Sequence, residues 1–144
     1  MIKKILLNQS GISLTMFVMM MPVIIGLMGL CVDGSYYLYE RIKLDMATDA
    51  AARGAVHSLD LNRWRGQREI VLDHQRAVQI IQELLAKNMP GARYTKVEIP
   101  ENAKNECIVE TEVTVPTFFM KVVGIQQYKV RAKATGKGFD LRNG

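Results

Sequence analysis

Few side chains in this chain of 144 residues could do chemistry; among them are two histidines and two cysteines. His57 and His74 lie far apart, and neither has a cysteine or carboxylate at the spacing of a metal-ligand pair. Cys31 ends an apolar run and Cys107 begins a candidate strand, so they could meet only if the chain folded back onto that run. We expect both to be buried as small apolar residues, with a disulfide between them as the lesser alternative. No metal site is predicted.

Other catalytic patterns are also missing from the sequence. No serine stands in a nucleophile elbow, and no glycine-rich loop could cradle a phosphate. The net charge of +5 comes from 19 basic and 14 acidic residues that are intermixed along the chain. A nucleic-acid-binding protein would gather its basic residues on one face or arm. We therefore expect neither an enzyme nor a nucleic-acid-binding protein, and no cofactor.

One long uncharged segment dominates the first part of the chain. The run from Ile12 to Cys31 has 20 residues and would span roughly 30 Å as a helix, the thickness of the hydrocarbon core of a bilayer. A cleaved secretory signal has a shorter apolar region of ~7–15 residues. Lys3 and Lys4 precede the run, and the positive-inside rule places that end in the cytoplasm. The run is thus predicted to be a single transmembrane helix, with the rest of the chain on the far side.

Pro22 interrupts this apolar run. Proline removes a backbone donor, so a kink at Pro22 that serves assembly is one interpretation. Membrane helices also tolerate proline without any functional consequence, and this alternative stays open.

No strong helix breaker separates Cys31 from about Leu59. Spacings of four among Leu38, Ile42, Met46 and Ala50 predict a helix over Tyr36–Ala55. Together with the apolar run this would form one rod of about 70 Å. Two helices with a break at Asp33-Gly34 are the alternative.

The remainder of the chain changes from helical to strand periodicity. An apolar stripe predicts a second helix over about Gln67–Lys87, followed by a stop at Asn88 to Gly91. Alternating apolar and polar residues then predict three strands, over Thr95–Ile99, Cys107–Val115 and Tyr128–Ala134. We expect a small antiparallel sheet with the second helix on its apolar face.

The outer faces of the second and third strands carry opposite charges. An antiparallel pairing would place acids opposite bases, and such cross-strand ion pairs help to set the register. The residues predicted to pair are Glu110 and Glu112 with Lys129, Arg131 and Lys133.

These elements predict an α+β chain in five parts. They are a cytoplasmic leader (1–11), the transmembrane helix (12–31), its continuation (32–59), a small α+β domain (60–138) and a tail (139–144).

The order of these parts resembles that of type IV pilin-like proteins, and its details resemble the TadE/TadG-like proteins of the Tad (tight adherence, Flp) pilus. The resemblance rests on Gly11, the apolar run, Val32-Asp33-Gly34, and above all the Asp-Ala-Ala-Ala-x-Gly-Ala tract that ends at Ala55. The segment from Val115 to Ile125 and the following Val-x-Ala-x-Ala strand are also similar to the family.

The resemblance implies a minor pilin or pseudopilin, or an assembly factor, of the inner membrane and periplasm. Processed members are cut after a glycine by a prepilin peptidase, which here would divide Gly11 from Ile12. Such pilins usually carry a glutamate a few residues beyond the cut, where this chain has Met16, and TadG-like members keep their helix uncut. Longer members also have a metal site of the form Asp-x-Ser-x-Ser. Because Tyr37 replaces the second serine of that motif, no metal is expected here.

Three functions are therefore open. The chain could be a pilin-like subunit whose helix packs with other pilin-like subunits and the inner-membrane platform in a hetero-oligomer. Small residues would then allow close helix approach, namely Gly26, Gly29, Ala47, Ala51 and Ala55. It could instead be a fixed inner-membrane assembly factor, or an unrelated signal-anchored periplasmic domain that captures a ligand at its sheet edge. Adhesion by an extracellular pilus belongs to the first of these.

Overall fold

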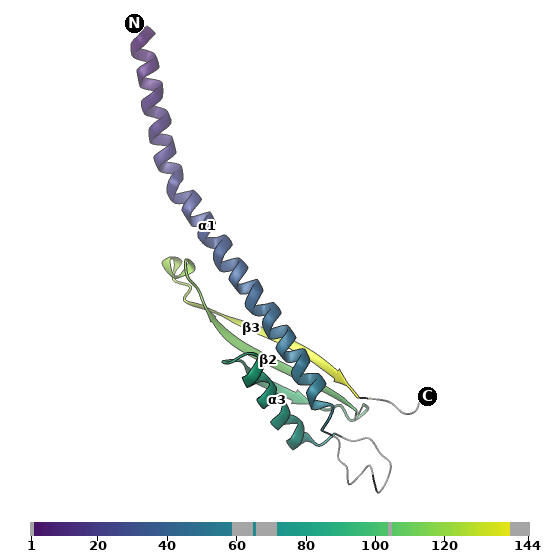
Figure 1. Cartoon of the computed structure of the whole chain (residues 1–144). Helices are drawn as coiled ribbons and strands as arrows, with labels where there is room; N and C mark the ends of the chain where they lie inside the picture. The colour runs from purple at the N-terminus through teal and green to yellow at the C-terminus, as the bar shows by residue number, and fades with distance from the viewer. Residues whose placement is uncertain (1, 59–64, 66–71, 104, 139–144) are drawn as a thin grey trace. The chain divides into compact units, whose positions relative to one another are not determined.

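The computed structural model of the chain describes residues 2–58, 65, 72–103 and 105–138, with side chains from residue 13 onward. The elements follow the order α1 (Ile2–Ala55), α3 (His74–Asn88), β1 (Arg93–Glu98), β2 (Glu106–Pro116), the 3-10 helix η1 (Met120–Val123) and β3 (Gln127–Lys137) (Figure 1). A long apolar helix, a second helix and a three-stranded antiparallel sheet confirm the predicted α+β fold.

The chain forms two compact units. We call Met1–Tyr36 with Thr117–Gln126 the anchor unit, and Tyr37–Pro116 with Gln127–Gly144 the sheet unit. The anchor unit joins the first part of α1 to the loop between β2 and β3. The sheet unit contains the rest of α1, α3 and the three strands.

α1 is one helix from Ile2 to Ala55, with Pro22 and Gly34 inside it. The predicted continuous helix is thereby confirmed, and the alternative of two helices is wrong. The helix ends earlier than the predicted Leu59, which itself lies outside the described residues. After Ala55 the amides of His57 and Ser58 donate to the carbonyls of Gly54 and Ala55, so a turn replaces the helical pattern.

The sheet has the order β1-β2-β3, and both pairings are antiparallel. β2 alternates as the sequence predicts, with buried side chains at every second position. β1 departs from its predicted pattern, since Thr95 is exposed and Val97 is only half-buried. A register shift between Tyr94 and Lys96 explains the exposure of Thr95, because it places Tyr94, opposite Thr111, on the face of Val97 in place of Thr95.

The core of the sheet unit forms where helices cover the apolar side of the sheet. Its fully buried side chains include Leu44 and Ala51 of α1, Ile81 of α3, and Val109 and Val130 of the sheet. The sequence predicted the second helix on this face, and the C-terminal half of α1 packs there too. Figure 1 shows this half of α1 crossing β2 and β3.

Close approach of α1 to β3 depends on Gly136. A Cβ atom at Gly136 would clash with the carbonyl oxygen of Ala52 and come within 2.6 Å of its carbonyl carbon. The missing side chain therefore lets the helix backbone rest directly on the strand. Tyr37 and Tyr128 also meet across this interface, with ring centroids 5.7 Å apart.

α3 begins later than the predicted Gln67. Residues 66–71 lie outside the described part of the chain, and within that part the helix starts after Asp73. The Asp73 carboxylate accepts hydrogen bonds from the amides of Gln75 and Arg76, which is the usual cap of a helix N-terminus. The helix ends at Asn88, next to the predicted end, and Gly91 follows with a φ of 96°.

Candidate anchoring and assembly surface

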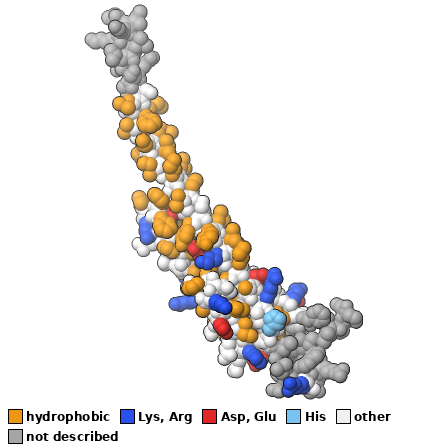
Figure 2. All heavy atoms as spheres, viewed as in Figure 1, with side chains coloured by type: hydrophobic (Ala, Val, Ile, Leu, Met, Phe, Trp, Pro, Cys, Tyr) orange, Lys and Arg blue, Asp and Glu red, His pale blue; other side chains and the backbone are white. Residues whose placement is uncertain are grey.

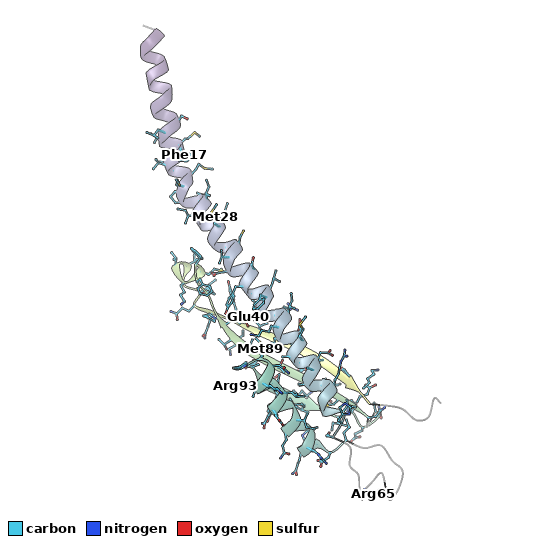
Figure 3. All side chains as sticks on the ribbon, in the orientation of Figure 1. Phe17, Met28, Glu40, Arg65, Met89 and Arg93 are labelled. Atoms are coloured by element: carbon cyan, nitrogen blue, oxygen red, sulfur yellow. The ribbon has the colours of Figure 1, made fainter. Side chains whose placement is uncertain are left out.

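The first part of α1 presents large apolar side chains on all of its described sides. Figure 2 shows them as a band of orange, and Figure 3 shows Phe17 and Met28 projecting from the helix. The exposed ones from Leu14 to Val32 are Leu14, Met16, Phe17, Val18, Met19, Met20, Met21, Val23, Ile24, Ile25, Leu27, Met28, Leu30 and Val32. A helix that is apolar on every side needs an apolar environment. Among the described residues one helix is long and apolar enough to cross a membrane, and it fits a single-pass anchor.

Asp33 stands at the end of this apolar surface and holds the β2–β3 loop. Its carboxylate accepts three backbone hydrogen bonds, from the amides of Phe118 at 2.9 Å, Phe119 at 2.9 Å and Met120 at 2.7 Å. Only 2% of the Asp33 residue is exposed. A buried charge is tolerated when its hydrogen-bonding capacity is met, and here the loop backbone supplies the donors.

The same contacts keep Asp33 ionised. Burial acts to raise the pKa of its carboxyl, but the three amides and the positive charge of Lys121 outweigh burial and lower the pKa below the ordinary 3.8. The ionised Asp33 carboxylate is therefore the form that binds the three amides of the loop.

Two ring contacts complete the attachment of the loop to α1 in the anchor unit. The rings of Tyr36 and Phe118 meet edge to face, with centroids 5.3 Å apart. The ring of Phe119 covers Gly29, where an added Cβ would lie 2.7 Å from two ring carbons. Gly29 is thus small because Phe119 occupies the space that its side chain would need.

The sequence predicted five small residues as contacts to other subunits, and the structure places four of them inside the chain. Ala47, Ala51 and Ala55 are buried in the core of the sheet unit, and Gly29 lies under Phe119. In a single copy of the chain these four positions are packed against the chain's own residues, and their role in contacts with other subunits stays a prediction. Gly26 alone has open space around it.

A different face of α1 is available in the sheet unit. Leu38, Ile42 and Met46 follow one another at spacings of four and are 57%, 55% and 69% exposed, and Tyr39 beside them is exposed too. We call these four residues the outer stripe. Large apolar side chains in a row on an exposed helix face mark an interaction surface. The spacing was visible in the sequence and served there to predict the helix, but it could not tell which face the sheet would cover.

The predicted charge pairs lie on the outer face of the sheet. Glu110 is opposite Lys133 with 3.0 Å between Oε1 and Nζ, and Glu112 is opposite Arg131 at 3.6 Å. Lys129 stands opposite Thr114 and not opposite a glutamate. A pair that the sequence analysis missed joins Glu106 to Lys137 at 3.0 Å. The basic groups are largely exposed and the glutamates are half-buried, so these pairs contribute to register more than to stability.

The remaining predicted site residues carry less structural information. The backbones of Gly11 and Ile12 lie within α1, while their side chains lie outside the described part, so cleavage between them stays a prediction. Pro22 lies inside the helix, and its predicted functional kink also stays a prediction.

His57 and His74 are exposed. Cys107 is buried as predicted, and burial raises the pKa of its thiol, but Cys31 is exposed; both thiols are free.

The comparison with protein families bears on α1 and the turn that follows it. Residues 11–58 match the putative Flp pilus-assembly TadE/G-like family. The resemblance predicted from the sequence is confirmed over this segment. The matched segment contains both Asp33 and the outer stripe. No curated protein and no solved structure matches the chain significantly.

Proposed function

We propose that the protein is a membrane-anchored minor pilin or pseudopilin of a Tad-type (Flp) pilus or secretion system. It acts by packing α1 against other pilin-like subunits and the inner-membrane platform. The observation that carries the proposal is the match of residues 11–58, which lies on the helix that also bears the exposed apolar surfaces.

The outer stripe supports this mode of action. The opposite face of the same helix stretch, with Leu44 and Thr48, is already buried against the sheet. Leu38, Ile42 and Met46 face away and have no cover within the described residues. A second helix that packs on the outer stripe would remove these side chains from water, and each could contribute on the order of 1 kcal/mol or more. Helix packing with sibling subunits is the arrangement that fits such a row.

The proposed placement follows from charge and length. Lys3 and Lys4 would keep the N-terminal end in the cytoplasm, and the sheet unit would lie in the periplasm or in an extracellular pilus. The membrane is the bacterial inner membrane, where a pilus of this type would be assembled.

A fixed assembly factor that never enters a filament is the second candidate, and Met16 favours it. Processed pilins carry a glutamate near this place, whereas Met16 is one more exposed apolar residue of the helix. The mass of the mature N-terminus separates the candidates. A chain that starts at Ile12 supports the pilin, and a chain that starts at Met1 supports the fixed factor.

Cross-linking in native membranes tests the packing of α1. In a Cys31→Ser background, Ile42→Cys and Lys43→Cys place a thiol on neighbouring exposed positions, one on the outer stripe and one beside it. Buried Cys107 remains as the unreactive internal thiol. With a maleimide that carries a photoactivated benzophenone, which needs no thiol on the partner, we expect adducts to pilin-like proteins from Ile42→Cys and much weaker adducts from Lys43→Cys. No adduct from Ile42→Cys, or equal adducts from both, would contradict the proposal.

A further inference from the structure

The loop Thr117–Gln126 between β2 and β3 carries an unusual concentration of exposed apolar side chains. Val122 is 92% and Val123 is 76% exposed, and Phe118, Phe119 and Ile125 are exposed as well. Connecting loops normally present polar residues to water, and single exposed apolar residues need no explanation. Five within one loop form a patch, which we call the apolar tip, and such a patch requires an apolar partner.

The loop has a defined shape that holds the apolar tip outward. Its two ends are joined by the amide of Thr117, which donates to the carbonyl of Gln126 at 3.0 Å. The amide of Ile125 donates to the carbonyl of Met120 at 3.0 Å and closes the turn around η1. Gly124, with a φ of 89°, ends η1 in a left-handed conformation that other residues rarely adopt. The exposure of Val122 and Val123 is therefore built into the backbone.

The attachment to α1 sets the level of the loop along the helix. Asp33 binds the amides of Phe118, Phe119 and Met120, and the Phe119 ring lies on Gly29. Gly29 belongs to the apolar run from Ile12 to Cys31, three residues before Val32. All of these residues belong to the anchor unit, where Figure 1 shows the yellow-green loop beside α1. A loop that touches Gly29 must lie where the membrane-spanning run ends.

We propose that the apolar tip inserts into the phospholipid bilayer, at the boundary between headgroups and acyl chains of the leaflet from which α1 emerges. The inference rests on α1 as the membrane anchor. Val122 and Val123 would enter the acyl boundary, and the exposed Lys121 between the apolar residues would reach lipid phosphates. The Asp33 carboxylate can stay at this level because the loop backbone satisfies it.

Continuity with the membrane helix favours lipid over a protein as the partner of the loop. Any protein that covered the apolar tip would have to do so at the membrane surface, where lipid is already present at high concentration. The loop and α1 would then form a two-point attachment, which fixes the rotation of the helix as well as its depth. A single helix alone leaves that rotation free.

Depth-dependent fluorescence quenching tests the proposal on the full chain. The protein in a Cys31→Ser background is reconstituted in vesicles of phosphatidylcholine and phosphatidylglycerol that contain no other protein. An environment-sensitive probe is attached at Val122→Cys or, as the matched control, at Thr135→Cys, an exposed position of β3. Quenching by spin-labelled lipid and by aqueous iodide is then compared.

We expect lipid quenching at Val122→Cys to exceed that at Thr135→Cys by about threefold or more, with iodide showing the reverse order. Equal accessibility to iodide at both positions would overturn the proposal, and it is the result expected if the loop docks on a protein. Carbonate extraction of the same vesicles tests membrane anchoring by α1 separately from insertion of the loop. Protein that stays in the pellet with a water-exposed probe refutes loop insertion alone, whereas release into the supernatant refutes both anchoring and loop insertion.

Discussion

A buried pair of threonines joins α1 to β2, and its hydrogen-bond direction makes a sharp prediction. The Thr48 hydroxyl donates to the carbonyl of Leu44 at 2.6 Å, and its oxygen lies 2.6 Å from the Thr111 oxygen. A hydroxyl has one proton, so Thr111 must be the donor to Thr48. Both residues are almost fully buried. Their replacement by valine should therefore have unequal costs.

Thr111→Val removes a donor but leaves the Thr48 hydroxyl bonded to Leu44, so the loss should be about 1 kcal/mol of unfolding free energy. Thr48→Val removes the one acceptor that the described residues offer to the Thr111 proton, and the buried donor that remains should cost about 2–3 kcal/mol. The double variant replaces both hydroxyls by methyl groups of the same shape. It should be less destabilised than the sum of the single variants by about 1–2 kcal/mol.

The unfolding free energies can be measured on the full chain in detergent micelles by pulse proteolysis across a series of urea concentrations. Thr135→Val on the exposed face of β3 is the control and should change stability by less than about 0.5 kcal/mol. Equal costs for Thr48→Val and Thr111→Val, or additive costs in the double variant, would refute the assigned direction.

Other features of the structure predict further outcomes. Asp33→Asn replaces one acceptor oxygen by a donor, so hydrogen exchange of the loop amides at Phe118–Met120 should accelerate about tenfold. The control variant Asp45→Asn, on the exposed side of α1, should leave the exchange of these amides unchanged. Because the pKa of Asp33 is lowered, its stabilising effect is fully present above 3.8 and is lost as the pH falls through the folded-state pKa. The protection of these amides, measured relative to the intrinsic exchange rate at each pH, should therefore fall only below 3.8. Gly136→Ala should cost about 1–3 kcal/mol of unfolding free energy, because its Cβ meets the backbone of Ala52, whereas Gly34→Ala has open space and should not destabilise the chain.

Much of the fold follows from the sequence because its periodicities are strong. The apolar run and the spacings of four fixed the continuous helix, and alternation located all three strands within a few residues. Periodicity could not predict which element packs against each face of a helix or strand. Ala47 and Ala51 are equally consistent with contact to a second protein or to the chain's own sheet, and only the folded structure shows that they are buried in the sheet unit.

The role of Asp33 shows the same limit at the candidate site. The sequence marks it as an acid just after an uncharged run, where it suggested a possible helix break, part of a family resemblance and the first residue of an incomplete metal motif, but not a ligand for a loop. Its partners are backbone amides more than eighty residues away, and backbone amides leave no trace in residue identity. One sequence feature could have predicted this contact, namely the apolar segment from Phe118 to Ile125. A loop with so many apolar residues is expected to pack against another part of the protein.

The two faces of α1 in the sheet unit differ in the size of their side chains, and this difference suits the proposed packing against a second subunit. The buried face uses small residues such as Ala47 and Ala51, since β3 approaches the helix backbone closely at Gly136. The outer stripe uses the large side chains of Leu38 and Met46, which no described residue covers. Large side chains on the buried face would push the sheet away, and small ones on the outer stripe would offer little area to a second helix. The division of residue sizes between the faces is therefore the arrangement expected of a helix that is packed once within its own chain and packs again against another subunit.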